Sequence, residues 1–166
     1  MALIEMTVEG IGIDPSNNPL VLLRDAERKV FVPIWIGPAE ARAIQIEIEG
    51  ARPSRPMSHD LMLSLIEALR GRVSRVVIND LLDSTFYATI DVDTPSGTKH
   101  IDARPSDAIA LAVRAKCPIF VDGGAQNALV DPEVIQGRPD SDATEDLAPD
   151  KADDEIDRFR RLLGEE

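Results

Sequence analysis

Several features that mark particular classes of protein are missing from the sequence. Cys117 is the only cysteine among 166 residues, so no internal disulfide can form, which favours a reducing compartment. No run approaches roughly 18 apolar residues, and the residues after Met1 lack a basic segment followed by an apolar one. We therefore expect neither a membrane span nor a secretory signal, and the sequence predicts a cytoplasmic protein without a membrane partner.

Basic and aromatic residues are also scarce. The chain has 18 Lys and Arg against 30 Asp and Glu, a net charge of −12, and 4% aromatic residues. Residues 131–166 hold 5 basic and 13 acidic side chains, so −8 of that charge lies there and −4 lies in residues 1–130. This composition excludes a broadly basic coat for nucleic acid and offers few aromatic platforms for stacking bases. It leaves room for a small basic site in residues 1–130.

Apolar periodicity predicts a single compact α+β domain over residues 1–130. Alternation of apolar and polar residues indicates antiparallel or mixed β-sheet meanders, packed with about three helices. Strands are predicted over residues 3–8, 20–23, 30–36, 72–82, 86–92, 98–102 and 119–121. Helices are predicted over residues 38–49, 59–70 and 105–116, where apolar residues recur at helical spacing.

Local signals refine these elements. Pro33 cannot donate to a ladder, so its strand should lie at an edge or contain a bulge. Ser58 is a natural N-cap for the second helix, and Asp83-Ser84 predicts the turn of a hairpin. The third helix is apolar nearly all round, which predicts that it is buried.

The C-terminal residues have a different composition. Residues 131–149 are dominated by Asp, Glu, Ser, Thr and Pro, which predicts an acidic, disordered linker. Residues 150–166 contain an apolar stripe with acidic residues before it and arginines after it, which predicts a short amphipathic helix. The stripe consists of Ile156, Phe159, Leu162 and Leu163.

The standard phosphate-binding, dinucleotide and zinc motifs are absent, so we expect no organic cofactor. A Pro-stiffened loop carries Arg52 and Arg55 into Ser58-His59-Asp60 at a helix start. Two arginines and a helix N-terminus can bind phosphate, with His59 carrying a proton near neutral pH. The alternative is an ordinary capped helix, in which Asp60 complements the helix dipole.

Two further polar clusters are candidates for a site. Asp102, Arg104 and Asp107 lie between a strand end and a buried helix, where carboxylates could hold a divalent cation and Arg104 a phosphate oxygen. The alternative is plain helix capping beside Pro105. Asp80, from the strand before the predicted hairpin turn, could line a pocket, although the run that contains it is most simply a hairpin.

Four ordered runs carry a resemblance to a known family. They are Val32-Pro33-Ile34-Trp35-Ile36-Gly37-Pro38-Ala39-Glu40-Ala41, Arg55-Pro56-Met57-Ser58-His59-Asp60-Leu61, Thr85-Phe86-Tyr87-Ala88 and Ile101-Asp102-Ala103-Arg104-Pro105-Ser106-Asp107-Ala108-Ile109-Ala110-Leu111. Over about residues 3–130 the chain resembles the bifunctional nuclease domain family. The resemblance implies a compact α+β domain that hydrolyses phosphodiester bonds of DNA and RNA and is usually oligomeric, for which we expect a homodimer.

On this resemblance, we expect the polar clusters to form the active site of a metal-assisted phosphodiesterase. We expect His59, Asp102 and Asp107 to be catalytic, and Arg52, Arg55 and Arg104 to bind the substrate. We expect Asp80, Asp102 and Asp107 to hold Mg²⁺ or Mn²⁺. The alternative is a non-catalytic oligomeric module that binds a protein partner or a small ligand.

Overall fold

A computed structural model describes residues 3–27 and 29–132 of the chain. Its elements in chain order are β1 (Ile4–Ile13), β2 (Pro19–Asp25), β3 (Phe31–Trp35), α1 (Pro38–Ile48), α2 (Ser58–Ala68), β4 (Arg72–Leu82), β5 (Thr85–Thr94), β6 (Gly97–Ala103), α3 (Pro105–Ala115), β7 (Ile119–Val121) and the 3₁₀-helix η1 (Gly123–Ala128). The α+β class is confirmed. Apart from residues 131 and 132, the predicted linker and C-terminal helix lie outside the described residues. No described helix is both long and apolar enough to cross a membrane.

One mixed sheet contains all seven strands, in the order β3-β2-β1-β7-β4-β5-β6. The strands β1 to β3 and β4 to β6 form the two predicted antiparallel meanders. The short strand β7 joins them, because Ile119 pairs with Met6 in antiparallel β1 and with Val76 in parallel β4. Pro33 lies in β3 at the edge of the sheet, as its missing N–H predicts.

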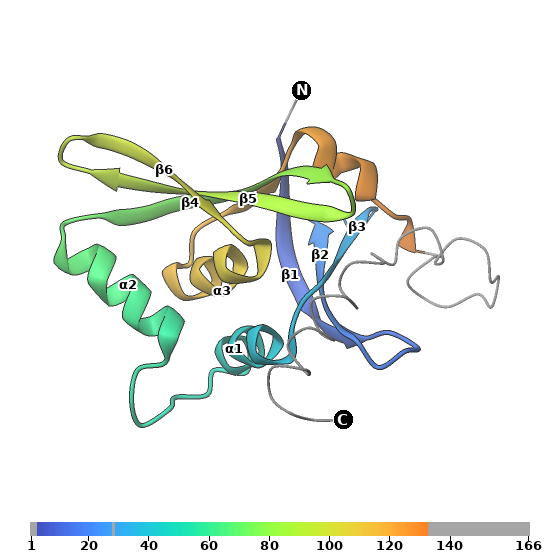
Figure 1. Cartoon of the computed structure of the whole chain (residues 1–166), viewed down its shortest axis with the longest axis horizontal. Coiled ribbons are helices and arrows are strands. Elements are labelled where there is room, and N and C mark those ends of the chain that lie inside the picture. Colours follow the sequence, from blue (N-terminus) through green and yellow to red (C-terminus); the bar gives the residue numbers. More distant parts are fainter. Residues whose placement is uncertain (1–2, 28, 133–166) are drawn as a thin grey trace.

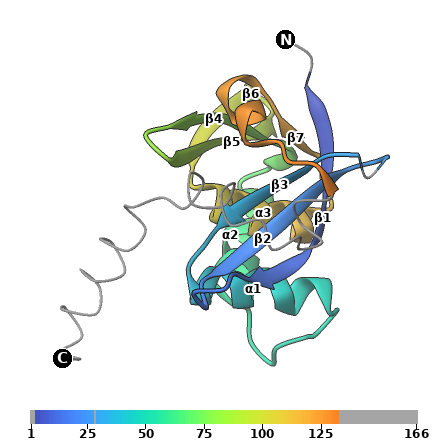
Figure 2. The ribbon, with the colours of Figure 1, turned by 90° about the vertical axis from the view of Figure 1, so that its right-hand side faces the viewer.

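The sheet curls around α3. The strands β4 to β6 pass over this helix, and β1 to β3 pass along its side (Figures 1 and 2). The first turns of α1 and α2 lie against α3 on the same side of β4 to β6. The prediction of a buried third helix is confirmed, because its apolar residues are at most 2% exposed from Ala108 to Ala112. The core therefore places the start of α3 at the point where all three α-helices meet.

Turn and cap residues account for the β4–β5 turn and for the start of α2. Asp83 and Ser84 have φ values of 48° and 60°, so they form the predicted hairpin turn between β4 and β5. The prediction of Ser58 as N-cap is wrong, because Met57 is the N-cap and Ser58 is the first helical residue. Asp60 in the first turn of α2 accepts the Met57 N–H at 2.8 Å, and this bond fixes the helix start one residue earlier.

Candidate functional site

The first turns of the three α-helices meet around the carboxylate of Asp107. The ring nitrogen His59 Nε2 lies 2.9 Å from Asp107 Oδ1, and Arg104 Nε donates to Asp107 Oδ2 at 2.8 Å. Arg104 also forms an ion pair with Glu40 in α1, with 3.2 Å between Nη2 and Oε1. These four residues, which we name the Asp107 cluster, come from α1, α2, and the start of α3. Packing on α3 brings them together across 48 residues of sequence between His59 and Asp107.

Hydrogen bonds and neighbouring charges keep Asp107 and Arg104 in their charged forms. Burial would raise the pKa of Asp107, but the hydrogen bonds from Arg104 and His59 hold that pKa below its ordinary value. The hydrogen bond to Asp107 and the charges of Asp107 and Glu40 raise the pKa of Arg104. The Arg104 side chain is 66% exposed, whereas that of His59 is 9% exposed. The cluster therefore presents a guanidinium to solvent above a histidine whose ring is fixed by a carboxylate.

A second network beside the Asp107 cluster holds the helices in place. Arg114, near the end of α3, donates from Nε to Asp60 Oδ1 at 2.8 Å. It also donates to the Ala110 carbonyl at 2.8 Å and to the Ala43 carbonyl of α1 at 3.0 Å. Its side chain is 3% exposed, so this buried cation ties all three helices together. The sequence pattern does not reveal these contacts, because Asp60 and Ala43 lie 54 and 71 positions from Arg114.

The structure brings only some of the predicted site residues to the Asp107 cluster. His59, Arg104 and Asp107 meet in it. Asp102 does not, because Thr89 pairs with Asp102 while buried Ala88 pairs with Ala103, and alternation directs Asp102 away from the helices.

The remaining predicted residues lie elsewhere. Asp80 accepts the N–H of Leu81 at 2.9 Å and lies against η1, where a Cβ on Gly124 would collide with its carboxylate. Arg52 pairs with Glu47 at 3.5 Å. Arg52 and Arg55 line a cavity of about 240 Å³ beside α2, which Asp60 also lines. Its lining includes Asp60, the neighbour of His59 in sequence, but no residue of the Asp107 cluster.

The predicted metal ligands do not converge within the described residues. Asp80, Asp102 and Asp107 belong to different parts of the fold, and Asp107 already accepts bonds from two basic side chains. In residues 3–27 and 29–132, no group of three or more His, Cys, Asp or Glu side chains could hold a metal ion. The donor set of this part of the chain therefore does not fit a resident metal.

Comparison with known proteins adds a family to this geometry. The family model described as "Bifunctional nuclease domain" matches residues 21–127, which include the whole Asp107 cluster. The chain belongs to the bifunctional nuclease domain family. Two proteins of Mycobacterium tuberculosis are each 39% identical to it over 162 residues, which cover 96% of this chain and 92% of the relative. They are named uncharacterized protein MT1877, from strain CDC 1551 / Oshkosh, and uncharacterized protein Rv1829, from strain ATCC 25618 / H37Rv.

This bifunctional nuclease domain contains a second histidine–carboxylate pair, on the sheet face turned away from α3. Arg75, Asp91 and His100 are direct neighbours across β4, β5 and β6. His100 Nδ1 lies 2.6 Å from Asp91 Oδ1, and Arg75 Nε donates to Asp91 Oδ2 at 2.6 Å. Burial would raise the pKa of Asp91, but these two bonds hold it below its ordinary value. Sequence reasoning missed this row, because only the register of both hairpins shows that the three residues meet.

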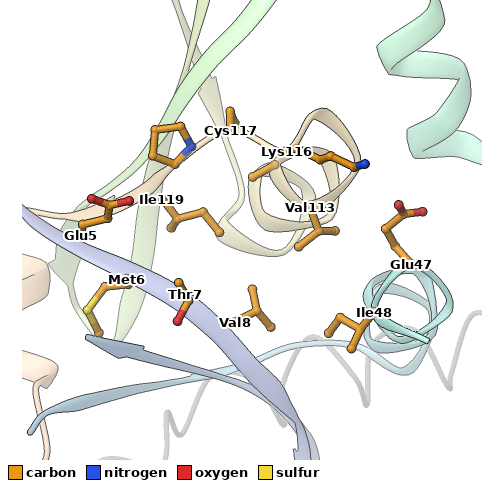
Figure 3. Close-up of a pocket in the computed structure, with 12 residues that line it drawn as sticks. Glu5, Met6, Thr7, Val8, Glu47, Ile48, Val113, Lys116, Cys117 and Ile119 are labelled. Atoms are coloured by element: carbon orange, nitrogen blue, oxygen red, sulfur yellow. The ribbon is translucent and has the colours of Figure 1, made fainter. Parts of the chain in front are cut away.

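The same domain also has a wide groove on another side (Figure 3). It has a volume of about 720 Å³ and lies between β1, the end of α1 and the end of α3. The groove has apolar walls from Val8, Ile48, Val113 and Ile119 (Figure 3). Lys116 and Glu47 add one basic and one acidic group to its lining. Cys117 also lines the groove, and burial raises the pKa of its thiol, so we expect it to be a poor nucleophile.

Proposed function

We propose that the protein hydrolyses phosphodiester bonds of DNA and RNA at the Asp107 cluster. Membership of the bifunctional nuclease domain family supports a nuclease-related function. The observation that carries the choice of site is the bonding of His59 and Arg104 to the two oxygens of one carboxylate. This arrangement combines a proton carrier with a cation beside it, and both can lower the barrier to phosphodiester hydrolysis.

Three members of the Asp107 cluster have separate tasks in this reaction. Arg104 binds a non-bridging phosphate oxygen and offsets the charge that develops on it as water attacks phosphorus. His59 moves a proton between the attacking water and the departing sugar oxygen as the P–O bond breaks. Asp107 fixes the imidazole and stabilises its protonated form. Because the His59 side chain is 9% exposed, the phosphate approaches over Arg104, the exposed member of the pair.

Dependence on Mg²⁺ or Mn²⁺ stays a prediction of the sequence. None of the roles proposed for His59, Arg104 and Asp107 depends on a metal, because the carboxylates of the described residues do not converge on one. Cleavage by EDTA-treated protein, compared with and without each added cation, tests this prediction directly. Cleavage that needs an added cation would support a metal held jointly by protein and substrate.

The assay for the proposed function compares two exposed arginines. We expect Arg104→Gln to lower kcat/KM on labelled DNA and RNA by about 100-fold, because the variant loses the cation that binds the developing charge. Arg42→Gln is the matched control, because Arg42 is an exposed arginine of α1 outside the cluster, and it should cleave like the parent. Absence of cleavage by highly purified parent protein, or equal cleavage by Arg104→Gln, would overturn the proposal.

We infer that the nuclease is a homodimer in which a second copy covers α2. This helix exposes large apolar side chains that a monomer would leave in water: Leu61 is 53% exposed, Met62 41%, Leu65 54% and Leu69 80%. They follow one another along one side of the helix, at a spacing that suits packing against another helix. Covering this face would place two Asp107 clusters near one interface, because His59 lies in the first turn of α2.

Polar substitutions on α2 test the dimer. We expect Leu61→Gln combined with Leu65→Gln to shift the protein from dimer to monomer in light scattering coupled to size exclusion. Leu82→Gln is the control, because Leu82 is also 53% exposed but lies at the hairpin turn between β4 and β5. A parent that is monomeric throughout, or a double variant that stays dimeric, would contradict this interface.

A second candidate function is a non-catalytic module that binds a small ligand or a protein partner. The groove of about 720 Å³ favours it, because ligand sites commonly have this size and apolar walls with a few polar groups. This function predicts that rigorously purified parent protein cleaves neither DNA nor RNA. The nuclease assay therefore separates the two candidates.

A further inference from the structure

The row of Arg75, Asp91 and His100 has the arrangement of a general base. The Asp91 side chain is 5% exposed and ionised, so it can only accept hydrogen bonds. The proton shared with His100 therefore belongs to Nδ1, so Nε2 is the ring nitrogen that can take a proton from a substrate. Because the His100 side chain is 67% exposed, Nε2 is accessible to a substrate. Asp91 is the positioning residue that fixes the ring and its tautomer.

Arg75 supplies a cation beside this base. Its Nε is used by Asp91, so its two Nη groups can donate to an anion, and its side chain is 44% exposed. A phosphate held by Arg75 would lie next to His100 on a face that no described helix covers along β5 and β6 (Figure 1). The exposed ring of Tyr87 lies on the same face of β5, four residues or about 13 Å from Asp91. It gives a base of a single strand a surface for stacking.

A neighbouring row shows that a histidine is not needed to tie these strands together. Arg72 donates to Asp93 at 3.0 Å, and Thr98 of β6 donates to the same carboxylate at 2.8 Å. This second row has the same arginine–aspartate pair two residues further along β5, and threonine takes the place of histidine on β6. The imidazole of His100 therefore adds chemistry that the link between β5 and β6 does not require.

We propose that His100 is the general base of a second catalytic site, which cleaves single-stranded RNA through its 2′-hydroxyl. Nε2 takes the proton of the 2′-hydroxyl, and O2′ forms a bond to the adjacent phosphorus as the P–O5′ bond breaks. A water molecule supplies the proton that O5′ needs as it leaves, and the hydroxide that remains takes the proton from His100 Nε2, which returns the base to its starting form. The products are a 2′,3′-cyclic phosphate and a 5′-hydroxyl, and Arg75 offsets the charge on the phosphoryl oxygens.

RNA is the fitting substrate because the row offers a base and a cation, and RNA itself supplies the nucleophile. The 2′-hydroxyl is already held beside its phosphorus, so the substrate itself provides the oriented nucleophile. DNA lacks that hydroxyl and is not a substrate of this site. The inference shares with the proposed function only the class of substrate, because the Asp107 cluster lies on the opposite side of the sheet and acts through water.

The test follows 2′,3′-cyclic phosphate, a product that hydrolysis by water at the Asp107 cluster does not leave. The substrates are one RNA oligonucleotide, its 2′-O-methyl form and the matching DNA. We expect His100→Gln to lower the rate of cyclic phosphate formation by about 100-fold or more and to leave DNA cleavage unchanged. The parent should form no cyclic phosphate from 2′-O-methyl RNA. Free imidazole should restore part of the rate to His100→Ala, which a merely structural role would not allow.

Thr98→Ala is the matched control, because it removes the corresponding β6 side chain of the neighbouring row, and it should keep the parent rate. Equal cyclic phosphate formation by His100→Gln and parent, or none by the parent, would overturn the second site.

The proposals for the Asp107 cluster and for the His100 site can fail independently of each other. If DNA cleavage depends on Arg104 but RNA gives no cyclic phosphate, the proposal for the Asp107 cluster stands and the His100 site is overturned. If cyclic phosphate formation depends on His100 but DNA is not cleaved, the His100 site stands and the proposal for the Asp107 cluster is overturned.

Discussion

Replacing Asp107 by Asn is expected to lower the rate of DNA hydrolysis by about 100-fold or more while the fold is kept. The side chain has nearly the same shape, so packing at the start of α3 changes little. The carboxylate now accepts from His59 and Arg104 on its two oxygens. An amide has one accepting oxygen and carries donors on its nitrogen, so it cannot accept both bonds, and it loses the charge that stabilises protonated His59. The measurement is kcat on labelled DNA at saturating substrate.

The control for this substitution is Asp83→Asn, which makes the same chemical change in an exposed turn. Asp83 has a φ of 48°, a conformation that Asn adopts readily, so the variant should fold and cleave like the parent. Circular dichroism and thermal unfolding would show that Asp107→Asn is folded. A folded Asp107→Asn variant that cleaves DNA at the parent rate would exclude the Asp107 cluster as the site of hydrolysis.

The sequence predicts the two meanders because their strands are neighbours along the chain and are joined by short turns. Alternation shows which residues of each strand face the core, and Asp83-Ser84 marks one turn. The sequence also predicts a strand over 119–121 but not its partners. A three-residue strand carries too short a pattern to show that it pairs with both β1 and β4, and these pairs join the two meanders into one sheet.

The candidate site shows the same division between local and distant information. His59 and Asp107 are each conspicuous in sequence as polar residues at helix starts, but only the packing of α2 on α3 shows that they meet. Asp102 is equally conspicuous, yet the pleat of β6 directs it to the opposite face. Asp91 looks like an ordinary outward residue of an alternating strand. Its burial and its bond to His100 follow from the registers of two hairpins, which alternation alone does not specify.

Replacing Arg114 by Met is expected to destabilise the fold strongly, because it removes a buried cation that binds all three α-helices. The free energy of unfolding should fall by about 3 kcal/mol, which corresponds to a decrease in Tm of about 10 °C. Methionine fills much of the volume, but Asp60 loses its charged partner and the Ala43 carbonyl of α1 loses its donor. Thermal and urea unfolding measure the effect. Arg42→Met, on the exposed side of α1, is the control and should change Tm little.

The pH dependence of the Tm difference shows whether the loss of the Arg114–Asp60 ion pair, and not only a packing defect, destabilises the variant. Burial raises the pKa of Asp60, but the Met57 N–H and Arg114 outweigh it and leave the pKa below its ordinary value of 3.8. A carboxyl group with a lowered folded pKa stabilises the protein above its unfolded pKa, and that stability is lost as pH falls through the folded value. The Tm difference between parent and Arg114→Met should therefore be constant near neutral pH and narrow below about pH 3.8. A difference that does not narrow would show that Arg114 stabilises the helices through its backbone bonds and packing, without Asp60.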